Sequence, residues 1–463
     1  MITVENAPLT WRHIRIVAVA SMGQMIGTAV ATIVSVIIPM IQILGHPELA
    51  SWEQGLLGAV DLIGIAVGAA VLGKLSNRYG YLLFFRLCPV LVMISALVCI
   101  FMPYIPVTFI SLFIMGFAIG GEYSLDSDYV SELMPVKWRS VMVGVTKAAS
   151  ALGNIIVAGV AYLLIVHWQN ADNWPKLMWL MVAFGGIMIL SRIRFASSPK
   201  WLLEHGRRKE AARALRILLG PGVALSQESL SIPSAKNVES VKSSDIPFGR
   251  FIMKNIRQII LTGIPWACEG LGVYGIGVFL PVLVLALGIT HDSADISQIM
   301  HVASSVEITF WISCIILPGF IIGLLIIRKL RSTVQMAWGF YLSAFSMTVL
   351  LLAFHFKWES WILIAAFMAF ELFLNAGPHL ITYVLPPEVY PVSDRSLGSG
   401  IAASMGKIGA VLAVFFIPVI LRQGGVMAVL AVSVAVMVIG GVVTSVFGPK
   451  VLPAGKKTDK REH

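Results

Sequence analysis

The sequence predicts an all-α membrane protein with twelve transmembrane helices in two pseudo-symmetric bundles of six. Three observations predict this fold class: long apolar runs recur from residue 14 to residue 448, basic residues gather in alternate connections, and the two halves of the chain repeat each other. Apolar residues make up 57% of the 463 residues and charged residues 13%, half of the usual ~25%. This composition excludes a soluble enzyme, a disordered scaffold and a disulfide-rich secreted protein.

Each expected span is a run of about 20 or more predominantly apolar residues, the length that crosses the hydrocarbon core of a bilayer as a helix. Because the number of spans is even, both chain ends lie on the same side of the membrane. The expected spans are residues 14–41, 54–76, 82–101, 105–133, 140–166, 175–194, 256–287, 297–327, 333–355, 359–386, 393–421 and 425–448.

The basic residues orient the chain. Of its 34 Lys and Arg residues, 29 fall on the side of the two termini, and only Lys176, Lys357 and Arg422 fall on the other side. By the positive-inside rule both termini are cytoplasmic, in the plasma membrane or, in a bacterium, the inner membrane. The net charge of +10 is therefore a topology signal, and we expect no nucleic-acid partner. The first apolar run is too long for a cleaved signal peptide, so we expect it to be retained.

The apolar runs divide the chain into four parts. Residues 1–194 are expected to form an N-terminal six-helix bundle and residues 256–448 a C-terminal one. Between them, residues 195–255 form a cytoplasmic loop, which begins with an amphipathic helix from Ser198 to Leu219 and continues as a Ser-rich linker. Residues 449–463 form a basic cytoplasmic tail. The four cysteines have no metal-like spacing and are expected to be free thiols.

The two halves share a repeat at an offset of 256 positions. Two homologous bundles of the same orientation indicate a transporter that rocks around a site at the midplane between them. Chance identity in a Gly-rich sequence is the alternative, and the Arg and Glu pairs argue against it. The matched pairs are Gly121/Gly377, Glu132/Glu388, Pro135/Pro391, Val136/Val392, Arg139/Arg395, Ser140/Ser396 and Gly144/Gly400.

Several motifs resemble those of a known family. Residues 73–80, Gly-Lys-Leu-Ser-Asn-Arg-Tyr-Gly, resemble the loop between spans 2 and 3 of the major facilitator superfamily. Residues 198–203 and 387–391 are similar to its sugar-porter branch. Residues 116–125 in span 4 and 400–410 in span 11 resemble the phosphate:proton symporters of that branch. The resemblance implies the major facilitator fold and transport by alternating access.

The same resemblance assigns several site residues. In the symporters an acid and a tyrosine of span 4 serve the proton and the substrate, and here these positions hold Glu122 and Tyr123. A lysine of span 11 holds the anion, and here that position holds Lys407. Trp266 and Tyr274 in span 7 are spaced as in the symporters.

The charged residues within the spans indicate a functional site independently of the family resemblance. Each costs about 2.5–3.5 kcal/mol at the bilayer centre, so such groups must pair, take up a proton or face a water-filled cavity. The nine groups are Asp61, Glu122, Asp126, Asp128, Glu269, Glu307, Glu371, Lys147 and Lys407.

Depth along the helices suggests which of these charges meet. Asp126 and Lys147 flank the turn near residue 136 at similar distances, so we expect them to pair, either in the site or as a lock on that hairpin. Glu122, Glu269 and Lys407 are expected near the midplane, from both halves. There a lysine suits an anionic ligand, and a desolvated carboxylate can take up a proton. A structural ion pair of Glu122 with Lys407, or a purely structural Glu269, is the alternative.

Other charges lie toward the two membrane surfaces. Asp61 and Glu307 lie eight and eleven residues in from the outer ends of their spans, where they either bind an entering proton, form an outer gate or pack as protonated acids. No partner for Glu371 can be chosen from the sequence. A charge network is expected to close the cytoplasmic side, and its members are Arg78, Asp128, Glu132 and Arg139, with Glu388 and Arg395 as the repeat counterparts.

Polar and aromatic residues within the spans are candidates to line the substrate cavity, although a lone aromatic more often packs or lies at the interface. His379 follows Gly377-Pro378, which predicts a helix break, and it is either a titrating group or a core histidine with satisfied hydrogen bonds. The candidates are Tyr123, Lys147, Trp266, Tyr274, Asn375 and His379.

These features predict a proton-coupled symporter that imports a small anionic metabolite, with a proton on Glu122 or Glu269 and the anion on Lys407. Asp126, Asp61 and Glu307 are further candidates for proton coupling. An organic cation or drug is the alternative substrate, because seven acids stand against two lysines in the spans. A receptor without transport is a third hypothesis. No nucleophile–base set indicates an enzyme.

The expected partners are the substrate, protons and the lipid bilayer. We expect a monomer, and we expect no cofactor and no metal ion. Which substrate is carried, whether phosphate, sugar, sugar acid or aromatic acid, is not determined by the sequence.

Overall fold

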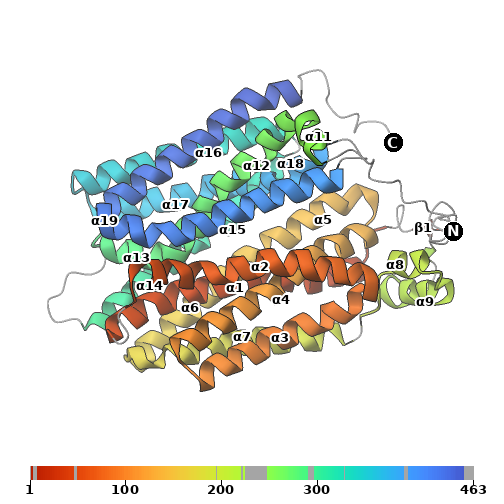
Figure 1. Cartoon of the computed structure of the whole chain (residues 1–463), viewed down its shortest axis with the longest axis horizontal. Helices are drawn as coiled ribbons and strands as arrows, with labels where there is room; N and C mark the ends of the chain where they lie inside the picture. Colours follow the sequence, from red (N-terminus) through yellow and green to blue (C-terminus); the bar gives the residue numbers. More distant parts are fainter. Residues whose placement is uncertain are drawn as a thin grey trace. The chain divides into compact units, whose positions relative to one another are not determined.

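The computed structural model of the chain describes residues 2–3, 8–45, 49–193, 195–220, 223–224, 248–289, 297–327, 329–390 and 395–452. Nearly all of these residues are helical (Figure 1). The strands of this described part are β1 (Ile2–Thr3) and β2 (Val223–Ala224), which pair in parallel. The structure therefore agrees with the predicted all-α class.

Up to the central loop, the helices alternate with short connections. They are α1 (Trp11–Leu44), α2 (Ser51–Tyr79), α3 (Tyr81–Phe101), α4 (Ile105–Leu133), α5 (Val136–Ala148), α6 (Ser150–Trp168), η1 (Ala171–Met178) and α7 (Trp179–Arg192). The loop contains α8 (Pro199–Glu204), α9 (Arg208–Leu218) and α11 (Phe248–Lys254). After it come α12 (Ile256–Gly270), η2 (Leu271–Ile276), α13 (Gly277–Ala286), α14 (Gln298–Cys314), α15 (Ile316–Ile326), α16 (Ser332–His355), α17 (Ser360–Ala376), α18 (Pro378–Val389) and α19 (Arg395–Val451).

Eleven helical segments of the described residues are long and apolar enough to cross a membrane. Most of the helices that contain them begin and end within a few residues of an expected span. The last segment, Leu397–Val451, covers the two final expected spans. It lies in α19, where the non-helical backbone of Gly425 (φ 66°, ψ −174°) joins two helices. The chain is a multi-pass membrane protein.

The helices form two compact units. Unit 1 comprises Met1–Ile33, Val60–Leu164 and Asp172–Lys242, and unit 2 comprises Val34–Ala59, Ile165–Ala171 and Ser243–His463. The main boundary, after residue 242, falls within the expected connecting segment 195–255.

In unit 1, glycines bring α2 and α4 into direct backbone contact. A Cβ atom added at Gly64 or Gly68 of α2 would lie 2.4 or 1.9 Å from a carbonyl oxygen of α4. A Cβ atom added at Gly116 or Gly120 of α4 would lie 2.0 or 2.2 Å from a carbonyl oxygen of α2. Such reciprocal pairs of small residues four positions apart are typical of tightly packed membrane helices.

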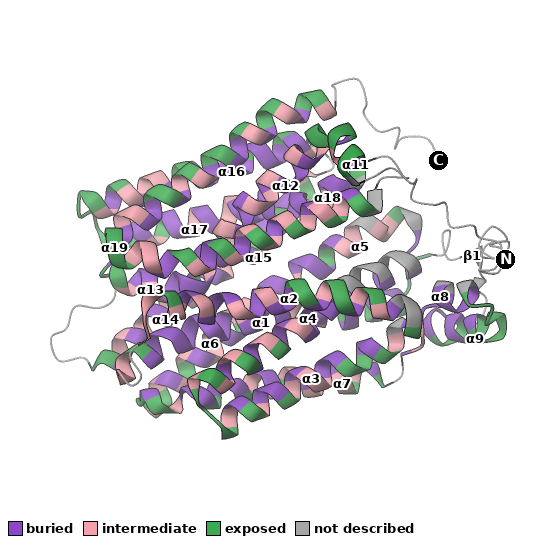
Figure 2. Ribbon diagram, viewed as in Figure 1, coloured by how far each residue is buried: buried purple, intermediate pink, exposed green. Residues whose placement is uncertain are grey.

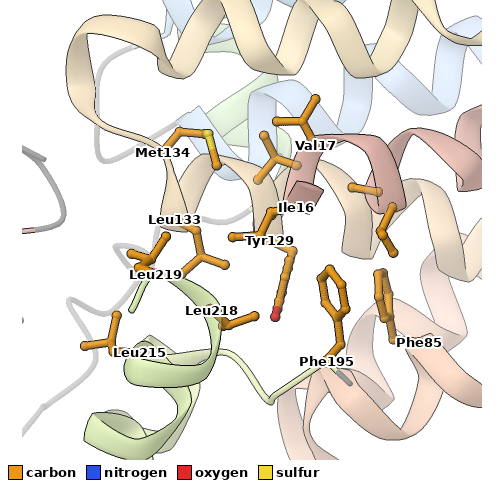
Figure 3. Close-up of a cluster of buried hydrophobic side chains, with 13 residues drawn as sticks. Ile16, Val17, Phe85, Tyr129, Leu133, Met134, Phe195, Leu215, Leu218 and Leu219 are labelled. Carbon is orange, nitrogen blue, oxygen red and sulfur yellow. The ribbon is translucent and has the colours of Figure 1, made fainter. Parts of the chain in front are cut away.

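The predicted amphipathic helix of the central loop is two helices. Gly206, with φ 73°, separates α8 from α9, because a left-handed residue ends a helix. Within unit 1, the buried face of α9 packs on α4. Figure 3 shows Leu218 and Leu219 beside Leu133 and Tyr129 of α4. The Tyr129 hydroxyl donates to the carbonyl oxygen of Ala196 over 2.8 Å, which fixes the start of the loop.

In unit 2, α12 and α19 pack through small residues, and α17 is broken from α18 at the predicted Gly377-Pro378 position. A Cβ atom on Gly409 would lie 2.6 Å from the backbone of Ala267. At the break, Gln335 Nε2 donates to the carbonyl oxygen of Ala376 over 2.7 Å. Ala376 is the last residue of α17, so this bond satisfies one of the carbonyls that the end of a helix leaves without an intrahelical partner.

Large apolar side chains are exposed along single helix faces. On α16, Trp338, Phe345 and Leu352 recur every seven residues and are 61%, 66% and 39% exposed. Figure 2 shows buried and exposed positions interspersed along the long helices. An apolar exposed stripe opposite a buried one is what a helix at the lipid boundary requires.

We expect Gly120→Ala to destabilise the protein, because the new methyl group would lie 2.2 Å from the Ile65 carbonyl oxygen. Overpacking of this kind costs about 1–3 kcal/mol, so the apparent Tm in detergent should fall by several degrees. Gly186→Ala in α7 is the matched control, since its Cβ would meet nothing within 4 Å. Equal Tm values for the two variants would contradict the close α2–α4 contact.

Candidate functional site

Unit 1 contains a buried ion pair between α7 and α4. The Arg192 side chain is fully buried, and its two terminal nitrogens donate to the two carboxylate oxygens of Glu122 over 2.7 Å each. Nη1 also donates to the carbonyl oxygen of Phe85 over 2.7 Å, and Cζ lies 3.6 Å from the centre of the Phe85 ring. This paired geometry is the strongest that a guanidinium makes with a carboxylate.

A second carboxylate shares the same cation. Asp126, one turn further along α4, is fully buried and lies 3.9 Å from Arg192 Nη2. Neither of its carboxylate oxygens accepts a hydrogen bond. On its other side is α1, where a Cβ atom on Gly23 would lie 1.9 Å from Oδ2. The cluster thus holds two acids and one fixed positive charge.

This arrangement corrects the expected pairing of Asp126 with Lys147. Lys147 Nζ makes no hydrogen bond with Asp126 and lies 5.9 Å from the centre of the Tyr123 ring. The alternative ion pair of Glu122 with Lys407 is replaced by the pair with Arg192. Arg192 falls within the expected span 175–194 but counts among the 29 basic residues on the side of the two termini, and its position inside an apolar run is the signal that could identify it.

In unit 2, Lys407 of α19 lies against an aromatic group from the span-7 helix. Its Nζ lies 3.3 Å from the Tyr274 hydroxyl and 4.6 Å from the centre of that ring. Tyr274 stands in η2, a turn of π-helix, which changes the face that the following side chains occupy. Gly406 allows Trp266 to pack directly on α19, because a Cβ atom there would lie 2.5 Å from the indole ring.

A carboxylate and a histidine form a second buried pair in unit 2. His379 Nδ1 and Glu269 Oε1 are hydrogen-bonded, and both side chains are buried. His379 stands in the first turn of α18, directly after the helix break. One turn later, Tyr383 is within electrostatic range of both Glu269 and Lys407, and its ring lies 5.1 Å from that of Trp266. The predicted residues of spans 7 and 11 are therefore neighbours.

The remaining predicted acids are in different surroundings. Glu371 is buried, and Asn375 donates to its carboxylate over 3.0 Å and to its carbonyl oxygen over 2.8 Å. The Asn375 amide, predicted to line the cavity, is thus engaged within its own helix. Asp61 is buried, and its Oδ1 accepts the amide of Leu62. Glu307 on α14 is half-buried.

The structure describes part of the expected cytoplasmic charge network. Arg139 Nη2 lies 3.5 Å from the carbonyl oxygen of Met134, and the exposed Glu388 accepts a hydrogen bond from Ser332 over 2.7 Å. The side chains of the other members, Arg78, Asp128, Glu132 and Arg395, lie outside the described residues. The network stays a prediction. Within the described part of the chain, no three His, Cys, Asp or Glu residues are grouped to hold a metal ion.

Comparison with known proteins identifies relatives along the whole chain. The family model described as "Sugar (and other) transporter" matches residues 3–453. The chain is 25% identical over 468 residues to the inner membrane metabolite transport protein YgcS of Escherichia coli strain K12, covering 100% of this chain and 98% of YgcS. It is 24% identical over 456 residues to a repressible high-affinity phosphate permease of Neurospora crassa, covering 88% and 78% of the two chains.

A solved structure has the same fold. It is that of the major facilitator superfamily proton:xylose symporter XylE, with a TM-score of 0.72 and 18% identity over 95% of this chain and 96% of that one. The predicted major facilitator fold is confirmed.

We expect Arg192→Gln to destabilise unit 1 strongly, because it leaves two buried carboxylates without a cation. Removing one member of a buried pair costs about 3–5 kcal/mol, which thermal unfolding in detergent would measure. Arg192→Gln combined with Glu122→Gln should recover part of the loss. Arg207→Gln is the control, because the Arg207–Glu210 pair is about half exposed and contributes at most ~1 kcal/mol. A wild-type Tm for Arg192→Gln alone would contradict the role of this pair.

Proposed function

Because the chain belongs to the sugar (and other) transporter family, we propose that it is a proton-coupled symporter that imports a small anionic metabolite by alternating access. The observation that carries the proposal is the unequal sharing of Arg192 by two buried acids. Glu122 occupies both terminal nitrogens of the guanidinium, and Asp126 is left at 3.9 Å without a hydrogen bond.

The charge balance of this cluster supports a proton site on Asp126. With both acids ionised and Arg192 charged, the buried cluster carries one net negative charge, which an apolar environment opposes. One proton on Asp126 makes the cluster neutral and leaves the Glu122–Arg192 pair intact. In this proposal Asp126 binds the coupled proton, and Glu122 holds the guanidinium in place.

Lys407 supports an anionic substrate. The Lys407 side chain is partly exposed, and its ammonium lies 3.3 Å from the hydroxyl of Tyr274 and 4.6 Å from the centre of that ring. An anion bound there would be held by Lys407 and the Tyr274 hydroxyl, with Trp266 and Tyr383 as aromatic neighbours. Lys147, beside Tyr123 in unit 1, is a second candidate cation for the substrate.

The Glu269–His379 pair is proposed as a second place where a proton can reside. The two buried side chains share a hydrogen bond, which joins α12 to the first turn of α18. Names of relatives also support the proposal: the Neurospora relative is a phosphate permease, and XylE is a proton:xylose symporter. We further propose that both termini lie in the cytoplasm.

We expect Asp126→Asn to abolish concentrative uptake while retaining exchange. Purified protein in liposomes, acidic outside, would be tested with radiolabelled phosphate, gluconate, benzoate and tetraethylammonium. Wild-type protein should accumulate one of the anions only with the gradient. Asp126→Asn should equilibrate and exchange that anion without accumulating it, because the cluster is then permanently neutral. Accumulation by Asp126→Asn, or gradient-independent uptake by the wild type, would contradict proton coupling through this residue.

We expect Lys407→Ala to raise the KM for the anion at least tenfold, because the ammonium that neutralises it is lost. Lys407→Arg should retain part of the affinity, and Lys450→Ala, at an exposed lysine near the end of α19, should leave uptake unchanged. Uptake kinetics in the same liposomes provide the measurement. If tetraethylammonium were the transported probe and Lys407→Ala improved its uptake, the organic-cation alternative would replace this proposal.

A further inference from the structure

The first turn of α1 and the last turn of α9 form one continuous edge of unit 1. Arg12 Nη1 lies 3.2 Å from the carbonyl oxygen of Arg216 and 3.4 Å from that of Ile217, both at the C-terminal end of α9. Gly220, with φ 101°, lets the guanidinium approach, since a Cβ atom there would lie 3.1 Å from Arg12 Cζ. A cation at a helix C-terminus satisfies carbonyls that have no intrahelical partner. The two helix ends are therefore fixed at the same level.

Exposed apolar side chains indicate the depth in the membrane at which these two helix ends lie. Trp11 is 75% exposed and is the first residue of the first membrane span. Ile14 on the next turn and Ile217 at the end of α9 are 44% and 48% exposed. Tryptophan at the end of a span lies at the headgroup level, where its ring contacts acyl chains and its N–H remains hydrated. The C-terminal end of α9, bound to Arg12, lies there too.

The outer face of α9 is basic. Lys209, Arg213 and Arg216 are exposed at positions i, i+4 and i+7, opposite the buried face that contains Ala211 and Leu218. The acid of this helix, Glu210, is paired with Arg207 over 2.7 Å. The stripe therefore keeps an excess of positive charge at its C-terminal end, which is the end that lies beside Trp11.

We propose that this edge, defined by Trp11, Arg213, Arg216 and Ile217, binds the headgroups of anionic phospholipids. Charge complementarity selects the ligand: guanidinium groups bind phosphate oxygens through paired hydrogen bonds, and the exposed apolar residues contact the adjoining acyl chains. A soluble acidic partner would meet the cations but would leave Trp11, Ile14 and Ile217 in contact with water. The inference concerns unit 1 alone and does not depend on the substrate or on proton coupling.

The test uses the full chain reconstituted in vesicles of phosphatidylcholine and phosphatidylglycerol. Native mass spectrometry of the extracted protein would measure the ratio of retained phosphatidylglycerol to phosphatidylcholine. We expect enrichment of phosphatidylglycerol on the wild type, and roughly a fivefold loss for each of Arg213→Gln and Arg216→Gln, the factor typical of one cation at an anionic surface. Arg207→Gln, at the residue that directly precedes α9, is the matched control, because that cation is already paired with Glu210.

A second measurement separates binding from misfolding. The variants should unfold at the wild-type temperature in pure phosphatidylcholine, because the Arg12 bonds use backbone carbonyls of α9 and not the substituted side chains. Equal retention of the two lipids by the wild type would overturn the proposal. So would full phosphatidylglycerol retention by an Arg213→Gln/Arg216→Gln protein, or binding of this edge to a soluble acidic peptide in preference to the lipid.

Discussion

The buried charges of unit 1 depend on one guanidinium. An arginine inside the hydrocarbon is tolerated only when its N–H groups meet acceptors, and the terminal nitrogens of Arg192 meet Glu122 and the carbonyl oxygen of Phe85. Arginine does not release its proton in proteins, so this positive charge is fixed. Any proton exchanged by the cluster is therefore exchanged by a carboxylate, and the geometry makes the two carboxylates unequal.

Helix α1 packs against Asp126, the carboxylate that accepts no hydrogen bond. Asp126 Oδ2 lies against the backbone at Gly23, where no donor reaches it and where any side chain would overlap it. A protonated carboxyl fits this apolar contact, whereas an ionised one favours an arrangement that admits water or a donor. Gly27, one turn later, meets the Tyr123 hydroxyl in the same way. Contacts through glycine at both positions bring the backbone of α1 directly against the Asp126 carboxylate and the Tyr123 hydroxyl of α4.

The sequence predicted the features that depend on position along the chain, such as the spans and the helix break. It did not predict the contacts that depend on which way a side chain points. The spans and the break at Gly377-Pro378 follow from apolar length and from the missing proline N–H, which are local properties. Asp126 and Lys147 do lie at similar distances along the chain from their shared turn. Depth along the helix does not, however, determine whether the two side chains face each other. The direction in which each side chain points also decides the contact. The cation nearest to Asp126 comes from α7, a helix outside this hairpin. Arg192 was missed because the positive-inside rule treats a basic residue at a span end as part of the loop.

The two units pair a buried carboxylate with different partners. At the repeat offset of 256, Gly121 and Tyr123 of α4 correspond to Gly377 and His379 of unit 2. In unit 1 the carboxylate beside this position, Glu122, is paired with Arg192, a cation that does not release its proton. In unit 2 the repeat position itself is a histidine that is hydrogen-bonded to Glu269. The repeat positions of the two units therefore stand beside buried carboxylates that have different partners, a guanidinium from α7 in unit 1 and an imidazole of α18 in unit 2, so the contacts of one half do not follow from those of the other by the repeat alone.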